Sequence, residues 1–227
     1  MTAQPVIIQT EPIGRPPHRS RACRQSDSWS DMELSVACAS DVSRDYGKGG
    51  RVTWPITPTN SGLGFLDPER ISKVDRGWRH VSGDAPSKEV LLHRAFYETR
   101  PGTGAVVHLH STYATALSCL QDLDEDDCIP PLTPYVVMRV GQVKLVPYMR
   151  PGDPASGDLI RDLAGGYAAV LLANHGPIVT GKDLASAVFA SEELEETAKL
   201  LLALRSLPCR MLTSGQVEEL RQVFGRS

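Results

Sequence analysis

Apolar and polar positions follow two different periods along the chain, and these periods predict its helices and strands. Helical patterns are predicted over residues 87–98, 113–120, 156–163 and 183–205. Short apolar runs predict strands over residues 104–110, 142–147 and 168–173, after a first short strand that begins at Trp54. The run at 168–173 is apolar throughout, as expected of a strand that is covered on both faces. Strands that alternate with helices predict an α/β layered domain.

The first 52 residues differ from the rest of the chain. Ser, Arg, Pro and Gly are frequent there, and neither the helical period nor the strand period persists. A turn-rich stretch at residues 57–62 opens the regular part of the chain. We therefore predict an atypical N-terminal segment over residues 1–52, disordered or unrelated to the later residues, and one domain over residues 53–227.

Composition and charge favour small-molecule chemistry in the cytoplasm. The formal net charge is −3, and the basic residues are dispersed, which excludes the electrostatic pattern of nucleic-acid or anionic-membrane binding. No apolar run approaches the roughly 18 residues of a membrane span, and the start has no apolar signal-peptide core. The five cysteines are scattered and form no C-x-x-C pair, which indicates a reducing compartment. We therefore expect a soluble cytoplasmic protein that binds neither nucleic acid nor membrane.

Three histidines form a candidate metal site. His108 and His110 are two residues apart on a predicted strand, so the pleat directs both imidazoles to one face. His175 lies where another predicted strand runs into an Asn-His-Gly-Pro turn, and strand ends are common ligand sites in α/β sheets. Three imidazoles would leave the fourth position of Zn²⁺ open, as in catalytic sites. The alternative is that each histidine only packs or hydrogen-bonds at a strand end, and the residues alone leave both interpretations open.

Three residues at one predicted helix start are candidates for substrate chemistry. Glu89 opens the helix that leads into the His108/His110 strand, and a carboxylate beside a Lewis-acidic metal can move protons. The alternative is an ordinary first-turn glutamate favoured by the helix dipole. Ser87 and Lys88 could bind a phosphate through a hydroxyl, an ammonium and free backbone N–H groups. Otherwise they are a helix cap and a solvated charge.

Four ordered stretches resemble the class II aldolase/adducin family, and they occupy residues 57–68, 87–93, 105–111 and 172–177. Two further stretches look like the branch of that family that decarboxylates 3-oxo-tetronate 4-phosphates in four-carbon acid sugar breakdown, and they occupy residues 130–135 and 146–153. The resemblance implies a class II aldolase-like layered fold, with a central, mainly antiparallel β-sheet flanked by helices.

The resemblance also implies roles for individual residues. His108, His110 and His175 would hold one Zn²⁺ per subunit, with Glu89 as the acid/base and as a candidate fourth ligand before substrate enters. The implied phosphate-binding residues are Thr59, Asn60, Ser87 and Lys88. Tyr135 would be a proton donor that reaches across from a neighbouring subunit of a homotetramer. Its alternative role is an aromatic side chain packed between prolines.

The implied reaction breaks a carbon–carbon bond in a small phosphorylated sugar acid. Loss of CO₂ from the β-keto acid leaves an enediolate, and protonation by Glu89 or Tyr135 gives dihydroxyacetone phosphate. Within the family, a sugar-phosphate aldolase or 4-epimerase of the fuculose-phosphate aldolase type is the alternative. From another class, the alternative is a non-catalytic, adducin-like interaction module, which has no need of three metal-binding histidines.

The chain departs from the family pattern at its start. Family members usually carry an N-terminal helix and a Gly-Asn-Ile-Ser stretch whose Asn contributes to the phosphate pocket, and this chain has no such stretch. Our hypothesis is that residues 1 to about 52 replace that start, through divergence or a sequence error. We expect the metal ligands to be retained and phosphate affinity and subunit packing to be weakened.

Overall fold

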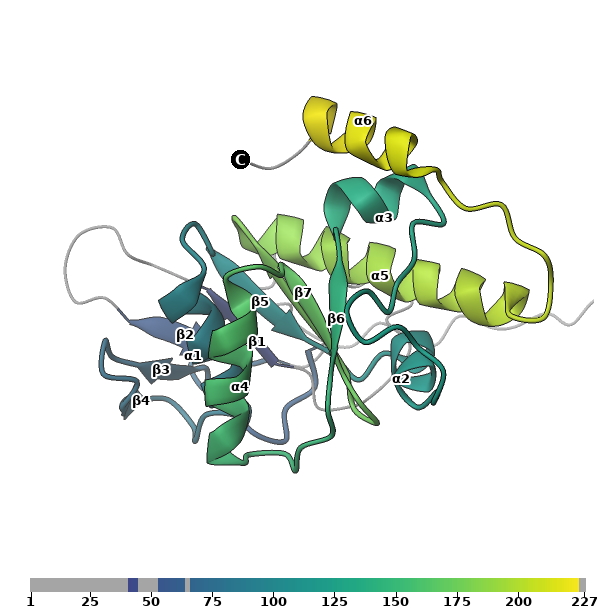
Figure 1. The fold of residues 1–227 in the computed structure, drawn as a ribbon. Helices are drawn as coiled ribbons and strands as arrows, with labels where there is room; N and C mark the ends of the chain where they lie inside the picture. Colours follow the sequence, from purple (N-terminus) through teal and green to yellow (C-terminus); the bar gives the residue numbers. More distant parts are fainter. Residues whose placement is uncertain (1–40, 45–52, 64–65, 225–227) are drawn as a thin grey trace, which may run out of the picture.

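Eight strands form one sheet in the computed structural model, which describes residues 41–44, 53–63 and 66–224 (Figure 1). The strands of these described residues are β1 (Asp41–Arg44), β2 (Trp54–Ile56), β3 (Ser72–Val74), β4 (His80–Ser82), β5 (Ala105–His108), β6 (Val143–Val146), β7 (Ala169–Leu172) and β8 (Gly176–Gly181). Their order across the sheet is β4-β3-β2-β1-β5-β8-β7-β6. Neighbouring strands are antiparallel except β6 and β7, which are parallel. The predicted central, mainly antiparallel sheet is therefore confirmed.

Helices cover both faces of this sheet. They are α1 (Val90–Thr99), α2 (Thr112–Ser118), α3 (Pro134–Arg139), α4 (Pro154–Ala164), α5 (Leu184–Leu204) and α6 (Ser214–Phe224). The helices α1 and α4 pack against each other on one face, while α5 runs along the other face together with α2 and α3 (Figure 1). Helix α6 packs on α3 and buries none of its own residues. None of the helices in the described residues combines the length and the apolar character that a membrane crossing needs.

The strand β7 shows how both faces are buried. Ala169 and Leu171 belong to the core beneath α2, α3 and α5, whereas Val170 and Leu172 belong to the core beneath α1 and α4. Successive side chains of a strand point to opposite faces, so a strand between two helical layers needs apolar residues at every position. This is why the run at residues 168–173 lacks polar residues.

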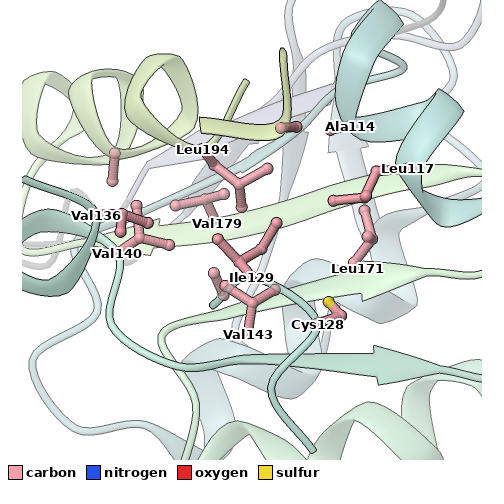
Figure 2. Close-up of a cluster of buried hydrophobic side chains, with 13 residues drawn as sticks. Ala114, Leu117, Cys128, Ile129, Val136, Val140, Val143, Leu171, Val179 and Leu194 are labelled. Carbon is pink, nitrogen blue, oxygen red and sulfur yellow. The ribbon is translucent and has the colours of Figure 1, made fainter. Parts of the chain in front are cut away.

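The larger core joins three helices to the β6, β7 and β8 end of the sheet. Figure 2 shows Leu194 of α5 and Leu117 of α2 directed toward the strands, with Ile129 between Val143 and Val179. All five side chains are at most 2 % exposed. Burying a large aliphatic side chain contributes roughly 1.5–3 kcal/mol, so this core is a main source of the domain's stability.

Most predicted elements occur with small shifts at their ends. The predicted helix over residues 183–205 is α5, and Asp183 is its N-cap, accepting a hydrogen bond from the backbone N–H of Ser186 at 2.7 Å. The predicted helix over residues 87–98 begins later, at Val90, because Ser87 and Glu89 form the preceding turn: the Ser87 hydroxyl accepts from the Glu89 N–H at 3.1 Å.

The predicted turn at residues 174–177 is shorter in the structure. Asn174 adopts a left-handed conformation with φ 56°, which asparagine tolerates better than most residues, and reverses the chain. Gly176 and Pro177 already belong to β8, which pairs with β7 and β5. Elements without a prediction are β1, β3, β4, β8, α3 and α6. The three-residue strands are too short for a period to be recognised.

The predicted N-terminal segment lies largely outside the described residues, which omit 1–40 and 45–52. Residues 41–44 are described and form β1, which pairs with β2 on one side and with β5 on the other. The division of the chain near residue 52 stays a prediction.

Candidate metal centre and adjoining cavity

Strand pairing brings the three histidines together. His108 ends β5 and His110 follows two residues later, while His175 lies in the loop between β7 and β8. Because β5 and β8 are antiparallel, the end of β5 lies beside the start of β8, and His108 pairs with Ile178. One nitrogen from each of the three rings lies within 4.8 Å of the other two. The three histidines predicted from the sequence to form a metal site therefore do converge in the structure.

A backbone carbonyl orients His108. Its ring is fully buried, and Nδ1 lies 2.9 Å from the carbonyl oxygen of Pro177. A carbonyl oxygen only accepts hydrogen bonds, so Nδ1 carries the hydrogen and Nε2 keeps its lone pair. Nε2 is buried and has no hydrogen-bond partner among the described residues. A buried imidazole nitrogen with a free lone pair, opposite a nitrogen held by a carbonyl, is the arrangement of a metal-ligating histidine.

The other two rings meet each other. Nε2 of His110 lies 2.8 Å from Nε2 of His175, and the ring centroids are 4.7 Å apart. Helix α2 anchors both residues: its N-cap, Ser111, directly follows His110, and the hydroxyl of Thr115 donates to the His175 carbonyl oxygen at 2.9 Å. The carboxylate of Glu195 accepts from two backbone N–H groups in the first turn of α2, both at 2.8 Å. The ligand loops are thus tied to one capped helix.

Burial favours the neutral form of all three imidazoles. It lowers the pKa of His110, and it lowers the pKa of His175 to about 4, to which the neighbouring His110 adds. Burial also holds the pKa of His108 well below its usual range, and the charges of the other two rings act in the same direction. Neutral imidazoles are the form that binds metal ions. The donor set therefore suits a divalent metal, with room for a further ligand.

Glu89 lies beside this centre. It is the N-cap residue of α1 and is 8 % exposed, and it lines a small, solvent-open cavity together with His175. The converging ligand atoms are those of the three histidines and include no Glu89 oxygen. The acid/base role fits this position, and the role of fourth ligand stays a prediction.

Backbone hydrogen bonds join the two segments that carry the residues predicted to bind phosphate. The backbone N–H of Thr59 donates to the carbonyl oxygen of Ala85 at 3.1 Å, and the N–H of Ser87 donates to the carbonyl oxygen of Thr57 at 3.3 Å. The turn at Asn60 therefore lies against the segment that leads into α1. Asn60 is exposed with φ 57°, and Lys88 is exposed as well. None of the four predicted residues lines the cavity beside His175.

Tyr135 lies away from the cavity of its own chain. It is the second residue of α3, is 55 % exposed, and has the guanidinium carbon of Arg139 5.3 Å from its ring centroid. It does not line the cavity, and α3 packs on α5 and α6. The expected contribution to a neighbouring subunit's site stays a prediction.

Two groups at the site have positions that the sequence analysis did not predict. The Pro177 carbonyl cannot be recognised in advance, because its contact with His108 spans 69 positions of the chain. Arg150 lines the cavity, although the resemblance of residues 146–153 to the decarboxylase branch implied no role for this residue. The available signal was a cationic residue placed directly before a Pro-Gly turn at the end of a predicted strand.

Comparison with known proteins agrees with this geometry. Residues 26–202 match the family model described as Class II Aldolase and Adducin N-terminal domain. A protein of Pectobacterium atrosepticum named 3-oxo-tetronate 4-phosphate decarboxylase is 57% identical over 210 residues, covering 88% of this chain and 96% of that protein. A protein of the same name from Escherichia coli K12 is 57% identical over 165 residues, covering 73% of this chain and 78% of that protein.

More distant relatives and solved structures extend the comparison. An L-fuculose phosphate aldolase of Methanococcus maripaludis is 32% identical, covering 77% of this chain and 97% of that protein. The crystal structure of YgbL from Escherichia coli superposes with a TM-score of 0.81 at 49% identity, covering 87% of this chain and 94% of that one. An L-fuculose 1-phosphate aldolase superposes with a TM-score of 0.77 at 26% identity, covering 91% and 97%.

Proposed function

We propose that this chain, which belongs to the class II aldolase and adducin family, decarboxylates a 3-oxo-tetronate 4-phosphate to dihydroxyacetone phosphate and CO₂. The observation that carries the proposal is the convergence of three neutral imidazoles beside a cavity that also contains Glu89. The relatives that bear this activity in their names support it over most of the chain.

We infer that the metal is Zn²⁺, one per subunit, held by His108, His110 and His175. The support is the all-imidazole donor set and the Nδ1–H of His108 held by a carbonyl. A bound Zn²⁺ supplies positive charge that stabilises the negative charge developing on substrate oxygens when a carbon–carbon bond breaks.

The protein's own residues position the substrate and move the proton. As CO₂ leaves, the electron pair of the bond between C1 and C2 remains on the substrate as an enediolate, and a proton added at C2 completes dihydroxyacetone phosphate. Glu89, buried at the start of α1 and facing the cavity shared with His175, is placed to deliver that proton.

The phosphate end of the substrate is assigned to Thr59, Asn60, Ser87 and Lys88. Support comes from the backbone bonds that hold the turn at Asn60 against the start of α1, where N–H groups at a helix N-terminus attract anions.

We further propose a cytoplasmic homotetramer in which Tyr135 of one subunit reaches the site of a neighbour. Support comes from its exposed position on α3, away from the cavity of its own chain. Mixing inactive Tyr135→Phe and inactive His108→Ala subunits tests this: shared sites would restore part of the activity, and no recovery would argue against a contribution in trans.

One assay decides between the proposed reaction and the related ones. Zinc-loaded protein is incubated with 3-oxo-tetronate 4-phosphate, and CO₂ and dihydroxyacetone phosphate are measured together. Equal amounts of the two products support the decarboxylase. An aldehyde co-product from a sugar phosphate, without CO₂, would instead support an aldolase, the activity named for the Methanococcus maripaludis relative. A protein without either activity that binds no zinc would favour the adducin-like module.

A further inference from the structure

The cavity beside His175 is lined by one cationic side chain, Arg150. This residue lies in the loop between β6 and α4, whereas His175 and Glu89 come from the β7–β8 loop and from the start of α1. Three separate elements therefore meet around one small, solvent-open cavity.

The backbone around Arg150 is a constrained turn. The carbonyl oxygen of Arg150 accepts a hydrogen bond from the N–H of Asp153 at 3.0 Å, with Pro151 and Gly152 between them. Gly152 has φ 75°, so the turn has proline at its second position and a left-handed glycine at its third, the pattern of type II turns. Asp153 is also the N-cap of α4, accepting from the N–H of Ala155 at 3.0 Å. The turn therefore presents Arg150 from a defined position.

The turn also packs against the start of α1. A Cβ added at Gly152 would lie 3.4 Å from the Cβ of Lys88, so the Arg150 loop and the helix that carries Glu89 are in close contact. Helices α1 and α4, on either side of this contact, lie side by side on the same face of the sheet (Figure 1).

The cavity is lined by one cationic residue, Arg150, and one acidic residue, Glu89. Its walls include Leu92, Val146, Ile160 and Leu172, which are apolar and at most 8 % exposed. Within the described part of the chain, none of the ion pairs involves Arg150. Arginine presents a planar fork of N–H donors that matches the two oxygens of a carboxylate.

We propose that Arg150 binds the substrate's carboxylate and makes the site specific for phosphorylated sugar acids over neutral sugar phosphates. This inference rests on the proposed function and extends it. The predicted phosphate residues do not line the cavity, whereas His175 and Glu89, which surround the reacting carbons, do. In a four-carbon 3-oxo acid 4-phosphate, the carboxylate and the phosphate lie at opposite ends of the ketone. The end that enters the cavity of Arg150 is therefore the carboxylate.

The apolar walls of the cavity also suit the conversion of the carboxylate to CO₂. A carboxylate loses its charge when it becomes CO₂, and an apolar surface favours the neutral product over the ion. Arg150 is exposed, so water screens its attraction. It can orient the carboxylate while the walls favour the release of CO₂.

Two ligands that differ in the carboxylate test the inference without turnover. The first is 4-phosphoerythronate, a four-carbon sugar acid that has a hydroxyl in place of the ketone and therefore cannot lose CO₂ as a β-keto acid. The second is dihydroxyacetone phosphate, which keeps the phosphate and the ketone but has no carboxylate. Isothermal titration calorimetry on the zinc-loaded full chain measures the affinity for each.

Arg150→Met should weaken 4-phosphoerythronate binding by roughly 10- to 100-fold, the range of a charged hydrogen bond of about 1.5–3 kcal/mol. Its affinity for dihydroxyacetone phosphate should stay unchanged, which also reports an intact fold. Arg150→Lys should recover part of the lost affinity, because lysine keeps the charge but not the fork. Arg76→Met, an exposed arginine in the turn between β3 and β4, is the matched control and should change neither affinity.

Other outcomes overturn the inference. Equal weakening of both ligands in Arg150→Met would place the residue at the phosphate or in the fold, and no weakening of either would mean that it binds no part of the substrate. The proposed function can fail while this inference holds. If the wild-type protein releases no CO₂ but binds 4-phosphoerythronate through Arg150, the carboxylate site is supported and the decarboxylase activity is not.

Discussion

The Nε2 atoms of His110 and His175 lie 2.8 Å apart although 65 positions of the chain separate the two residues. The antiparallel pairing of β5 with β8 brings them together, because it places the loop that follows β7 beside the end of β5. Both rings thereby direct a nitrogen to the point that the buried Nε2 of His108 also approaches. The metal centre is thus a consequence of sheet order.

Replacing His108 by alanine should remove the metal. The ring supplies one of three converging nitrogens, and its loss should lower zinc affinity by more than the roughly 10- to 100-fold that loss of an outer-shell partner costs. Zinc is measured per subunit by mass spectrometry after dialysis against a weak chelator. His80→Ala, a change at an exposed histidine of β4, is the control and should keep its zinc. Equal zinc in both variants would contradict the three-histidine site.

Replacing Glu89 by glutamine should slow turnover while leaving zinc in place. Glutamine keeps the shape of the side chain but cannot exchange a proton, so kcat should fall by roughly 10²- to 10⁴-fold. Zinc content should not change, since no Glu89 oxygen belongs to the converging ligand atoms. Glu69→Gln, at an exposed position before β3, provides the comparison for kcat. Loss of zinc in Glu89→Gln would show instead that Glu89 is a ligand.

The metal-free protein should lose stability as the pH falls below about 6.5. Burial lowers the pKa of His93 to about 3, from 6.5 in an exposed histidine. Between these values the unfolded chain binds a proton that the folded chain does not, so acid favours unfolding. This residue should therefore reduce the free energy of unfolding by up to about 1.4 kcal/mol per pH unit.

Urea denaturation of the metal-free protein between about pH 7 and pH 5 measures this slope. His93→Gln removes the titrating group, so its free energy of unfolding should fall less steeply across the same range, whatever its value at neutral pH. Identical slopes in the two proteins would show that His93 is protonated in the fold.

Two leucines of helix α5, one buried and one exposed, allow a matched test of the core packing. Leu194 is fully buried in the larger core, whereas Leu200 in the same helix is 42% exposed. Leu194→Ala should reduce the free energy of unfolding by roughly 2–5 kcal/mol through lost burial and a residual cavity. Leu200→Ala should change it by about 0.5 kcal/mol or less. Urea denaturation compares them, and similar losses would mean that α5 packs differently from the arrangement in Figure 2.

Local pattern was sufficient for the elements that flank the site. Three elements can be recognised from residues that are close together in the sequence. They are the helix α1, the strand β5 that carries His108, and the strand β7, which is buried on both faces. The spacing of His108 and His110 placed both on one face for the same reason, because alternation along a strand is a property of adjacent residues. The resemblance to a known family added Thr59, Asn60 and Tyr135 as candidate site residues, and the substrate class.

Sheet order, the tautomer of His108 and the cavity were decided by tertiary structure. The strand β8 was not predicted, yet its pairing with β5 brings His175 to the other two rings, and its Pro177 carbonyl holds the His108 Nδ1–H. The position of Arg150 beside His175 likewise depends on which loops meet at one end of the sheet. Periodicity reports only which face a residue occupies, whereas these contacts depend on which distant strands and loops become neighbours when both faces of the sheet are buried.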